Sequence, residues 1–191
     1  MKISLFPSSL IRRAYRHGLK RAGTNEDGVS SIEFAIIAPF LLLLYFGGIE
    51  LSLLMLADRQ VTTTSSTMGD LASRLLTATD QDINNIFAAS TQLLGNINSN
   101  QARLRISSLQ NIGGTVTVVW SDATANFSAL APGQSVPNLP PDVVPLNGTA
   151  IMTETEFDYT SELGFFLKGQ RNLDDRFFLR PRRTVSISRA P

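Results

Sequence analysis

The chain has 191 residues, 43% of them hydrophobic, and a formal net charge of +1 at pH 7. This length predicts one folded domain, in addition to a long apolar segment near the N-terminus. The sequence has no cysteine, which excludes disulfides, thiolate metal sites and thiol nucleophiles. His17 is the only histidine, so a Ser–His nucleophile pair is excluded for all later parts of the chain.

The first segment of the chain is basic. Residues 1–28 carry six basic and two acidic side chains (6 − 2 = +4), whereas residues 29–191 carry 11 basic and 14 acidic ones (11 − 14 = −3). Basic flanks of a membrane helix stay in the cytoplasm, so this asymmetry predicts a cytoplasmic N-terminus and an external C-terminal part. A basic arm can also bind nucleic acid. We predict no nucleic-acid partner, because this arm adjoins an apolar segment and the rest of the chain is mildly acidic.

The apolar segment covers residues 34–57, FAIIAPFLLLLYFGGIELSLLMLA, and Glu50 is its only charge. At about 1.5 Å per residue these 24 residues form a helix of roughly 36 Å, longer than the ~30 Å hydrocarbon core of a bilayer. No small-residue cleavage site follows the segment, which favours a retained helix over a secretory signal peptide. We therefore predict a transmembrane helix over residues 29–57.

A short motif opens this segment. Gly28 is followed five residues later by Glu33, directly before the apolar helix, and this arrangement resembles the processing site of type IV prepilins. The wider pattern resembles the TadE-like (TadE/TadF) pilus assembly proteins of the tight-adherence (Tad, or Flp pilus) system. The residues that carry the resemblance are Gly28, Val29, Ile32-Glu33-Phe34, Ala38-Pro39-Phe40 and Gly48-Ile49-Glu50.

The resemblance implies roles for three residues. A prepilin peptidase would cut between Gly28 and Val29, and Glu33 would then be the fifth residue of the mature chain. Charges within a membrane are costly and usually paired, and the resemblance implies that Glu33 meets the N-terminal amine of a neighbouring subunit during assembly. The alternative is that Glu33 lies at headgroup level and reaches water. For Glu50, near the outer boundary, we expect this second behaviour.

Beyond Ala57 the sequence becomes polar, but apolar residues recur at helical spacing at Val61, Met68, Leu71 and Leu75. This stripe predicts that the membrane helix continues out of the bilayer and docks one face on the folded domain. A second amphipathic helix is predicted from Ile83 to Leu94, ending at Gly95.

The second half of the chain carries strand patterns. Residues 103–108 alternate with period two, and Gly113-Gly114 precedes the β-branched run 115–120, which predicts a hairpin. Residues 124–149 contain five prolines and are predicted to be an extended surface loop. Further strands are expected over Ala150–Tyr159 and over Arg176–Ser188, the latter broken at Pro181. The fold class is α+β: a long N-terminal transmembrane helix continuing into an extracytoplasmic domain with an antiparallel sheet of three to four strands.

Little in this domain suggests chemistry. Lys168 is the only lysine beyond the apolar segment, and nothing around it supports a Ser–Lys nucleophile. The alternating acids Glu154, Glu156 and Asp158 would lie on one face of a strand. They could bind Ca²⁺, but the favoured interpretation is a solvated face paired with arginines. The arginines considered are Arg103, Arg105, Arg180 and Arg182.

The sequence therefore predicts a cytoplasmic basic leader (1–28), a transmembrane helix (29–57) and an extracytoplasmic α+β domain (58–191). We predict no catalytic residues, no metal and no cofactor. The resemblance implies a minor pseudopilin of the bacterial inner membrane, since the chain is longer than major Flp pilins and has Glu-Phe where they have Glu-Tyr. Its implied partners are a prepilin peptidase and other Tad pilus subunits. The alternative is an uncleaved bitopic anchor with an external scaffold or binding domain.

Overall fold

The computed structural model describes residues 26–95 and 102–190, which form two compact units, one ending at Gly48 and the other beginning at Ile49. The basic leader predicted over residues 1–28 lies outside the described residues, except for its last three.

Helix α2 (Glu26–Ser73) has 48 residues and contributes to both units. In the first unit its large hydrophobic side chains are exposed, among them Phe34 (68%) and Leu44 (74%). The apolar sequence therefore folds into helix here without covering itself, as expected for a segment whose natural surroundings are apolar.

In the second unit, one stripe of α2 is buried. Its members recur every three or four residues, which places them on one face of the helix. The buried residues of this stripe include Glu50, Ala57, Val61, Thr64, Met68 and Ala72. The prediction that the helix continues past Ala57 and docks one face on the domain is confirmed, although Leu75 lies beyond the end of α2.

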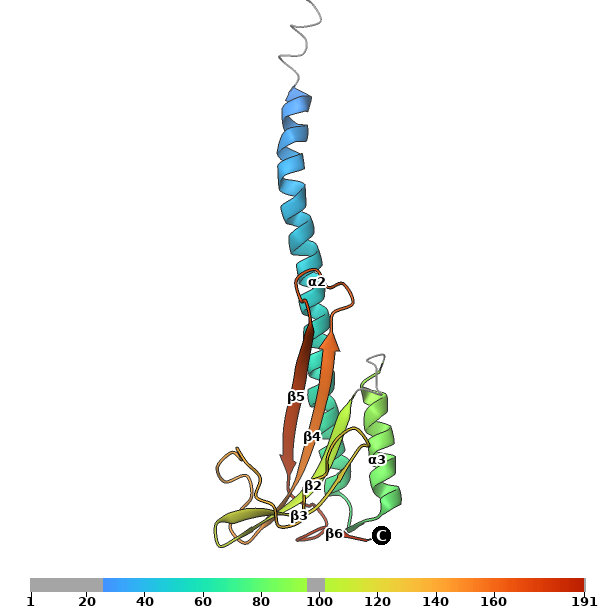
Figure 1. Ribbon diagram of the computed structural model, residues 1–191, viewed down its shortest axis with the longest axis vertical. Coiled ribbons are helices and arrows are strands. Elements are labelled where there is room, and N and C mark those ends of the chain that lie inside the picture. Colours follow the sequence, from blue (N-terminus) through green and yellow to red (C-terminus); the bar gives the residue numbers. More distant parts are fainter. Residues whose placement is uncertain (1–25, 96–101, 191) are drawn as a thin grey trace, which may run out of the picture. The chain divides into compact units, whose positions relative to one another are not determined.

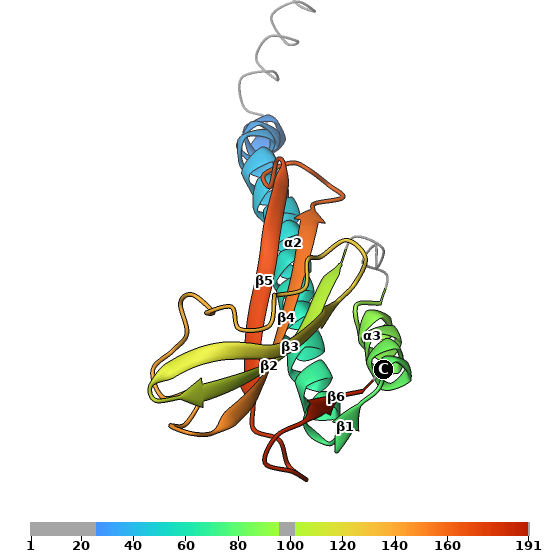
Figure 2. The ribbon, with the colours of Figure 1, turned by 60° about the horizontal axis from the view of Figure 1, so that its bottom comes forward.

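The sheet has four antiparallel strands in the order β3-β2-β4-β5 (Figure 2). These are β2 (Arg103–Ile112), β3 (Thr115–Ala123), β4 (Thr149–Thr160) and β5 (Gln170–Leu179). Gly113 and Gly114 join β2 to β3 with φ of 61° and 91°, which a glycine adopts without steric cost. The predicted α+β class, antiparallel sheet and hairpin are confirmed.

The position predicted for the fourth strand is wrong. Arg176–Ser188 was expected, but β5 covers Gln170–Leu179 and ends before Pro181. The sequence of β5 is QRNLDDRFFL, whose polar first half hides the strand pattern. β5 pairs with β4 along its whole length, from Thr160↔Gln170 to Ile151↔Leu179. This pairing orders the strand where the local sequence does not predict one.

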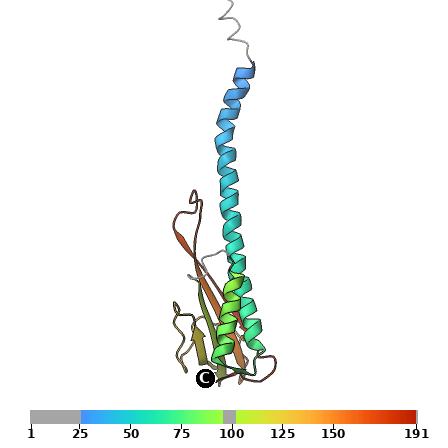
Figure 3. The ribbon, with the colours of Figure 1, turned by 90° about the vertical axis from the view of Figure 1, so that its right-hand side faces the viewer.

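Both helices lie on one side of the sheet (Figure 3). Helix α3 (Asp80–Leu93) begins with a capping box between Thr79 and Asp82 and ends before Gly95, as predicted. The main hydrophobic core lies between the helices and the sheet. Its buried members are Met68, Ala72, Ala78, Ile83, Ile86, Leu104, Ile106, Trp120, Ile151 and Ile187.

Small polar residues let α2 approach the sheet closely. The Ser65 hydroxyl donates to the backbone oxygen of Thr153 (3.3 Å), and the Thr153 hydroxyl donates to the backbone oxygen of Ser65 (2.8 Å). At Gly69 an added Cβ would lie 2.4 Å from the Leu179 side chain. The polar run after Ala57 is thus partly a helix–sheet interface.

The opposite face of the sheet carries a second core. The proline-rich segment is irregular over residues 124–148, as predicted, apart from an isolated bridge between Ser135 and Thr117, but it is not merely a surface loop. It buries Val136 and Val144 against Leu109, Val118 and Met152. This covering keeps the apolar end of that sheet face out of water.

Two short strands, β1 (Thr77–Ala78) and β6 (Ser188–Arg189), form a parallel pair that the sequence did not predict. The pair attaches the C-terminal segment beside α3 (Figure 1). Trp120 reinforces this attachment by donating its indole N–H to the backbone oxygen of Ile187 at 2.7 Å.

Candidate functional site on the apolar helix

The predicted processing and assembly residues all lie near the N-terminal end of α2, in the first unit. Gly28 has no atom within 4 Å of an added Cβ, Val29 is 59% exposed, and Glu33 is exposed. Consecutive helical positions place the three residues within about two turns. The cleavage after Gly28 and the assembly role of Glu33 remain predictions.

Glu50 does not behave as predicted. It was expected to reach water near the outer membrane boundary, but its side chain is buried with 1% exposure. Its carboxylate accepts four hydrogen bonds from the β4–β5 loop, residues 161–169. One oxygen accepts from the Ser161 hydroxyl (2.9 Å) and the Phe165 N–H (2.7 Å), and the other from the N–H groups of Phe166 (2.8 Å) and Leu167 (3.1 Å).

This arrangement is a backbone anion site closed by the protein's own carboxylate. Three successive N–H groups converge on one anion, as in the nests that bind phosphates and other anions. The chain turns at Gly164, whose φ of 61° favours glycine, and the Gly164 N–H donates to the Ser161 hydroxyl at 3.3 Å. The loop is therefore shaped around Glu50, and Figure 1 shows it beside α2 at one end of the sheet.

The same loop exposes large hydrophobic side chains. Leu163, Phe165 and Phe166 are 39%, 59% and 52% exposed, and the exposed basic residues Lys168 and Arg171 follow. The stretch of α2 beside the Glu50 contact is also apolar and exposed, with Leu51 at 55% and Met55 at 54%. The chain thus presents apolar side chains from two separate elements.

The acidic face of β4 forms ion pairs, as the favoured interpretation predicted, but it is not wholly solvated. Glu154 is 3% exposed and lies between Arg105 (2.5 Å) and Arg176 (2.7 Å). Arg105 also stacks on Phe127, 4.2 Å from the ring centroid. The two guanidinium groups compensate the burial of this carboxylate.

Arg103 forms ion pairs with the other two acids of this face, Glu156 and Asp158. It lies 3.0 Å from Glu156 and 2.7 Å from Asp158. Hydrogen bonds from Arg103 lower the pKa of Asp158 below its ordinary value. Of the other predicted partners, Arg182 pairs with Asp70 instead, at 2.7 Å. No group of acids, histidines or cysteines suited to a metal ion occurs among the described residues.

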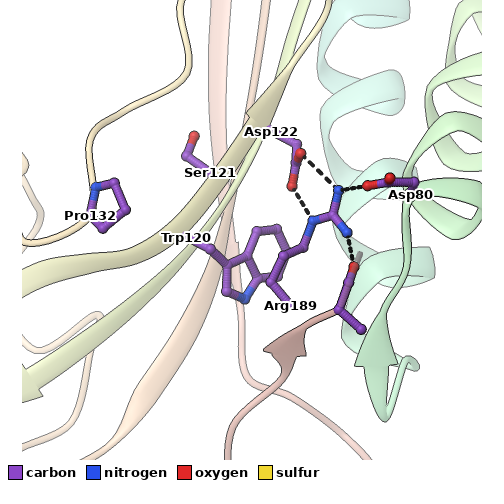
Figure 4. Close-up of a pocket in the computed structure, with 7 residues that line it drawn as sticks. Asp80, Trp120, Ser121, Asp122, Pro132 and Arg189 are labelled. Atoms are coloured by element: carbon purple, nitrogen blue, oxygen red, sulfur yellow. Dashed lines mark hydrogen bonds and ion pairs between the residues drawn. The ribbon is translucent and has the colours of Figure 1, made fainter.

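A pocket on the α3 side is lined by Asp80, Trp120, Asp122 and Arg189, with Ser121, Pro132 and Ala190 (Figure 4). Arg189 fills its polar side. It donates two hydrogen bonds to Asp122, at 2.8 and 3.1 Å, and another to Asp80. These bonds raise the pKa of Arg189, Asp122 contributing most. The single guanidinium therefore binds both carboxylates of the pocket and secures the C-terminal strand.

Together these features define a class of protein. The described residues contain one helix that is long and apolar enough to cross a membrane. An α+β domain follows it, with a four-stranded antiparallel sheet. This architecture fits a single-pass membrane protein.

Comparison with known proteins finds a likeness over part of the chain. The family model described as TadE-like protein matches residues 28–67. The match covers the apolar helix and its polar continuation, including Gly28, Val29, Glu33 and Glu50, so the resemblance predicted from the sequence is confirmed over this segment. It supports a component associated with a Tad pilus, and the matched family is one of pilus structural or assembly components. No curated protein and no solved structure matches the chain.

Proposed function

We propose that this protein is a minor pseudopilin of a Tad (Flp) pilus system, held in the bacterial inner membrane with its N-terminus in the cytoplasm. Residues 1–28 are a leader that a prepilin peptidase removes, residues 29–57 span the membrane, and residues 58–191 form the external domain. The observation that carries the proposal is the TadE-like match over residues 28–67, which begins at the proposed cleavage site. The net charge of +4 over residues 1–28 supports the orientation.

Glu33 is proposed to guide assembly. Cleavage would create an ammonium group on Val29, four residues before Glu33 in the sequence. In a low-dielectric setting a carboxylate is attracted to a neighbouring subunit's ammonium far more strongly than in water. Exposure of Glu33 on the described helix leaves it accessible to such a neighbour.

Processing is tested by intact-mass measurement of the protein from the cell envelope. With an active prepilin peptidase we expect a chain beginning at Val29, of 163 residues (191 − 28). Cells without the peptidase should contain only the uncleaved chain. The same full-length mass in both strains would contradict processing and favour the uncleaved bitopic anchor.

Assembly is tested separately with Glu33→Gln, which keeps the side-chain shape and removes the charge. We expect normal cleavage but loss of co-isolation with the other pilus subunits. Asp142→Asn, which removes one charge from an exposed loop, is the matched control and should co-isolate normally. Co-isolation of Glu33→Gln at the control level would make Glu33 an interfacial residue and exclude the ion pair.

A further inference from the structure

The β4–β5 loop binds α2 inside its apolar run and not beyond it. Glu50 is followed by seven more residues of that run, up to Ala57, before the first charges at Asp58 and Arg59. At a rise of 1.5 Å per residue, these seven residues extend about 10 Å along the helix. If the membrane boundary coincides with the end of the apolar run, the loop lies on the membrane side of it.

The composition of the loop agrees with this position. Its exposed residues Leu163, Phe165 and Phe166 are unusually apolar for a turn between two strands. The exposed Lys168 follows them in the loop, and the exposed Arg171 lies at the start of β5. Apolar side chains next to basic ones are typical of segments that enter the headgroup region of a bilayer.

We propose that residues 161–169 form a second membrane-contacting element, which inserts Leu163, Phe165 and Phe166 into the external interface of the bilayer beside α2. The occupant of this surface is lipid, because the loop is bound to the span at Glu50, and the span's own Leu51 and Met55 are exposed and apolar at the same level. Lys168 and Arg171 then lie where anionic headgroups can bind them. The proposal depends on α2 spanning the membrane, and not on a role in a pilus.

Glu50 makes the insertion possible. A carboxylate next to the hydrocarbon region is costly unless it is fully hydrogen-bonded, and so are unpaired backbone N–H groups of a loop. The Glu50 carboxylate and the N–H groups of Phe165, Phe166 and Leu167 satisfy one another. These hydrogen bonds lower the free-energy cost of placing both the carboxylate and the N–H groups in an apolar environment. Glu50 therefore anchors the loop.

The natural absence of cysteine allows a direct test. Single cysteines at Phe166, Met55 and Val185 of the full chain are labelled with the fluorophore NBD. The protein is then reconstituted in phosphatidylethanolamine–phosphatidylglycerol vesicles containing nitroxide lipids. Met55 (54% exposed) reports the helix, and Val185 (83% exposed) lies in the segment after β5, at the other end of the sheet.

We expect quenching of the label at Phe166 to lie within about twofold of that at Met55, with little quenching at Val185, because only the first two contact lipid. Quenching at Phe166 as weak as at Val185 would overturn the proposal. Quenching at Phe166 that depends on the protein-to-lipid ratio would also overturn it, because a second copy would then cover the loop.

The role of Glu50 is tested in the same assay with Glu50→Gln, and with Ser161→Ala, which removes only one of the four donors. Quenching at Phe166 should fall strongly in the first variant and less in the second, while quenching at Met55 stays unchanged. The emission of Trp120, the only tryptophan, reports whether the domain remains folded. Unchanged quenching at Phe166 in a folded Glu50→Gln protein would exclude Glu50 as the anchor.

Discussion

The two parts of α2 differ in what covers them. Before Gly48 its large hydrophobic residues, such as Leu42 (56%) and Leu44 (74%), are exposed. From Ile49 onward a stripe including Val61 and Met68 is buried against the protein's own domain. The apolar half of α2 thus has side chains that need an apolar environment outside the protein. The more polar half buries one face in the core of the domain. Hydrophobicity of the sequence alone does not tell which half packs within the fold.

Glu33, directly before the apolar run, and Glu50, inside it, show the same contrast. Glu33 is exposed, whereas Glu50 is enclosed by four hydrogen bonds from its own chain. The proposed assembly role therefore belongs to the exposed Glu33, and the proposed anchoring role to the enclosed Glu50.

The largest effect is expected from a substitution in the packed half of α2. Met68→Ala removes a fully buried side chain from the main core and should lower the free energy of unfolding by about 2–5 kcal/mol. Leu42→Ala, in the exposed half, should change it by less than about 0.5 kcal/mol. Denaturant unfolding of the purified full chain, followed by Trp120 fluorescence, measures both.

Equal destabilisation by Met68→Ala and Leu42→Ala would contradict the division of α2. A stable Met68→Ala protein would likewise show that the core between α2 and the sheet is not what holds the domain together.

A smaller effect is expected at two glycines of the same helix. Gly69→Ala adds a methyl group 2.4 Å from Leu179 and should cost about 1–3 kcal/mol through overpacking. Gly48→Ala is the matched control, because no atom lies within 4 Å of its added Cβ. Alanine has the higher helix propensity, so Gly48→Ala should leave the domain as stable or slightly more stable.

Thermal unfolding of the two alanine variants distinguishes them. Equal unfolding temperatures for Gly69→Ala and Gly48→Ala would contradict overpacking at Gly69, because the Leu179 side chain would then move aside without cost.

Much of this fold was accessible from the sequence. Strong periodicity predicted the continuation of α2 through Val61 and Met68, the amphipathic α3 and the alternating strand beginning at Arg103. Gly113-Gly114 marked the hairpin. These signals are local, so they survive without knowledge of the tertiary contacts.

The remaining features depend on contacts between distant residues. Strand β5 begins with the polar residues Gln170–Asn172, whose composition does not predict a strand. Pairing with β4 orders them. The two-residue strands β1 and β6 exist only because the C-terminal segment returns to α3. No local pattern contains that information.

Helical spacing in the sequence could have predicted the burial of Glu50. Counting back from Val61 in helical steps of four, three and four residues reaches Ala57, Leu54 and Glu50, so Glu50 is on the docked face. Its partners, in contrast, are backbone N–H groups of a loop more than 110 residues later, which side-chain chemistry does not reveal.

The central claim is that the apolar half of α2 crosses a membrane and places the domain outside the cytoplasm. The most direct measurement compares two reporter fusions, one after Ser188 and one near Arg21, using an enzyme that is active only outside the cytoplasm. We predict high activity for the fusion after Ser188 and none for the fusion near Arg21, because the basic leader keeps the N-terminus inside. Lack of activity at both positions, with both fusion proteins stably produced, would contradict the account.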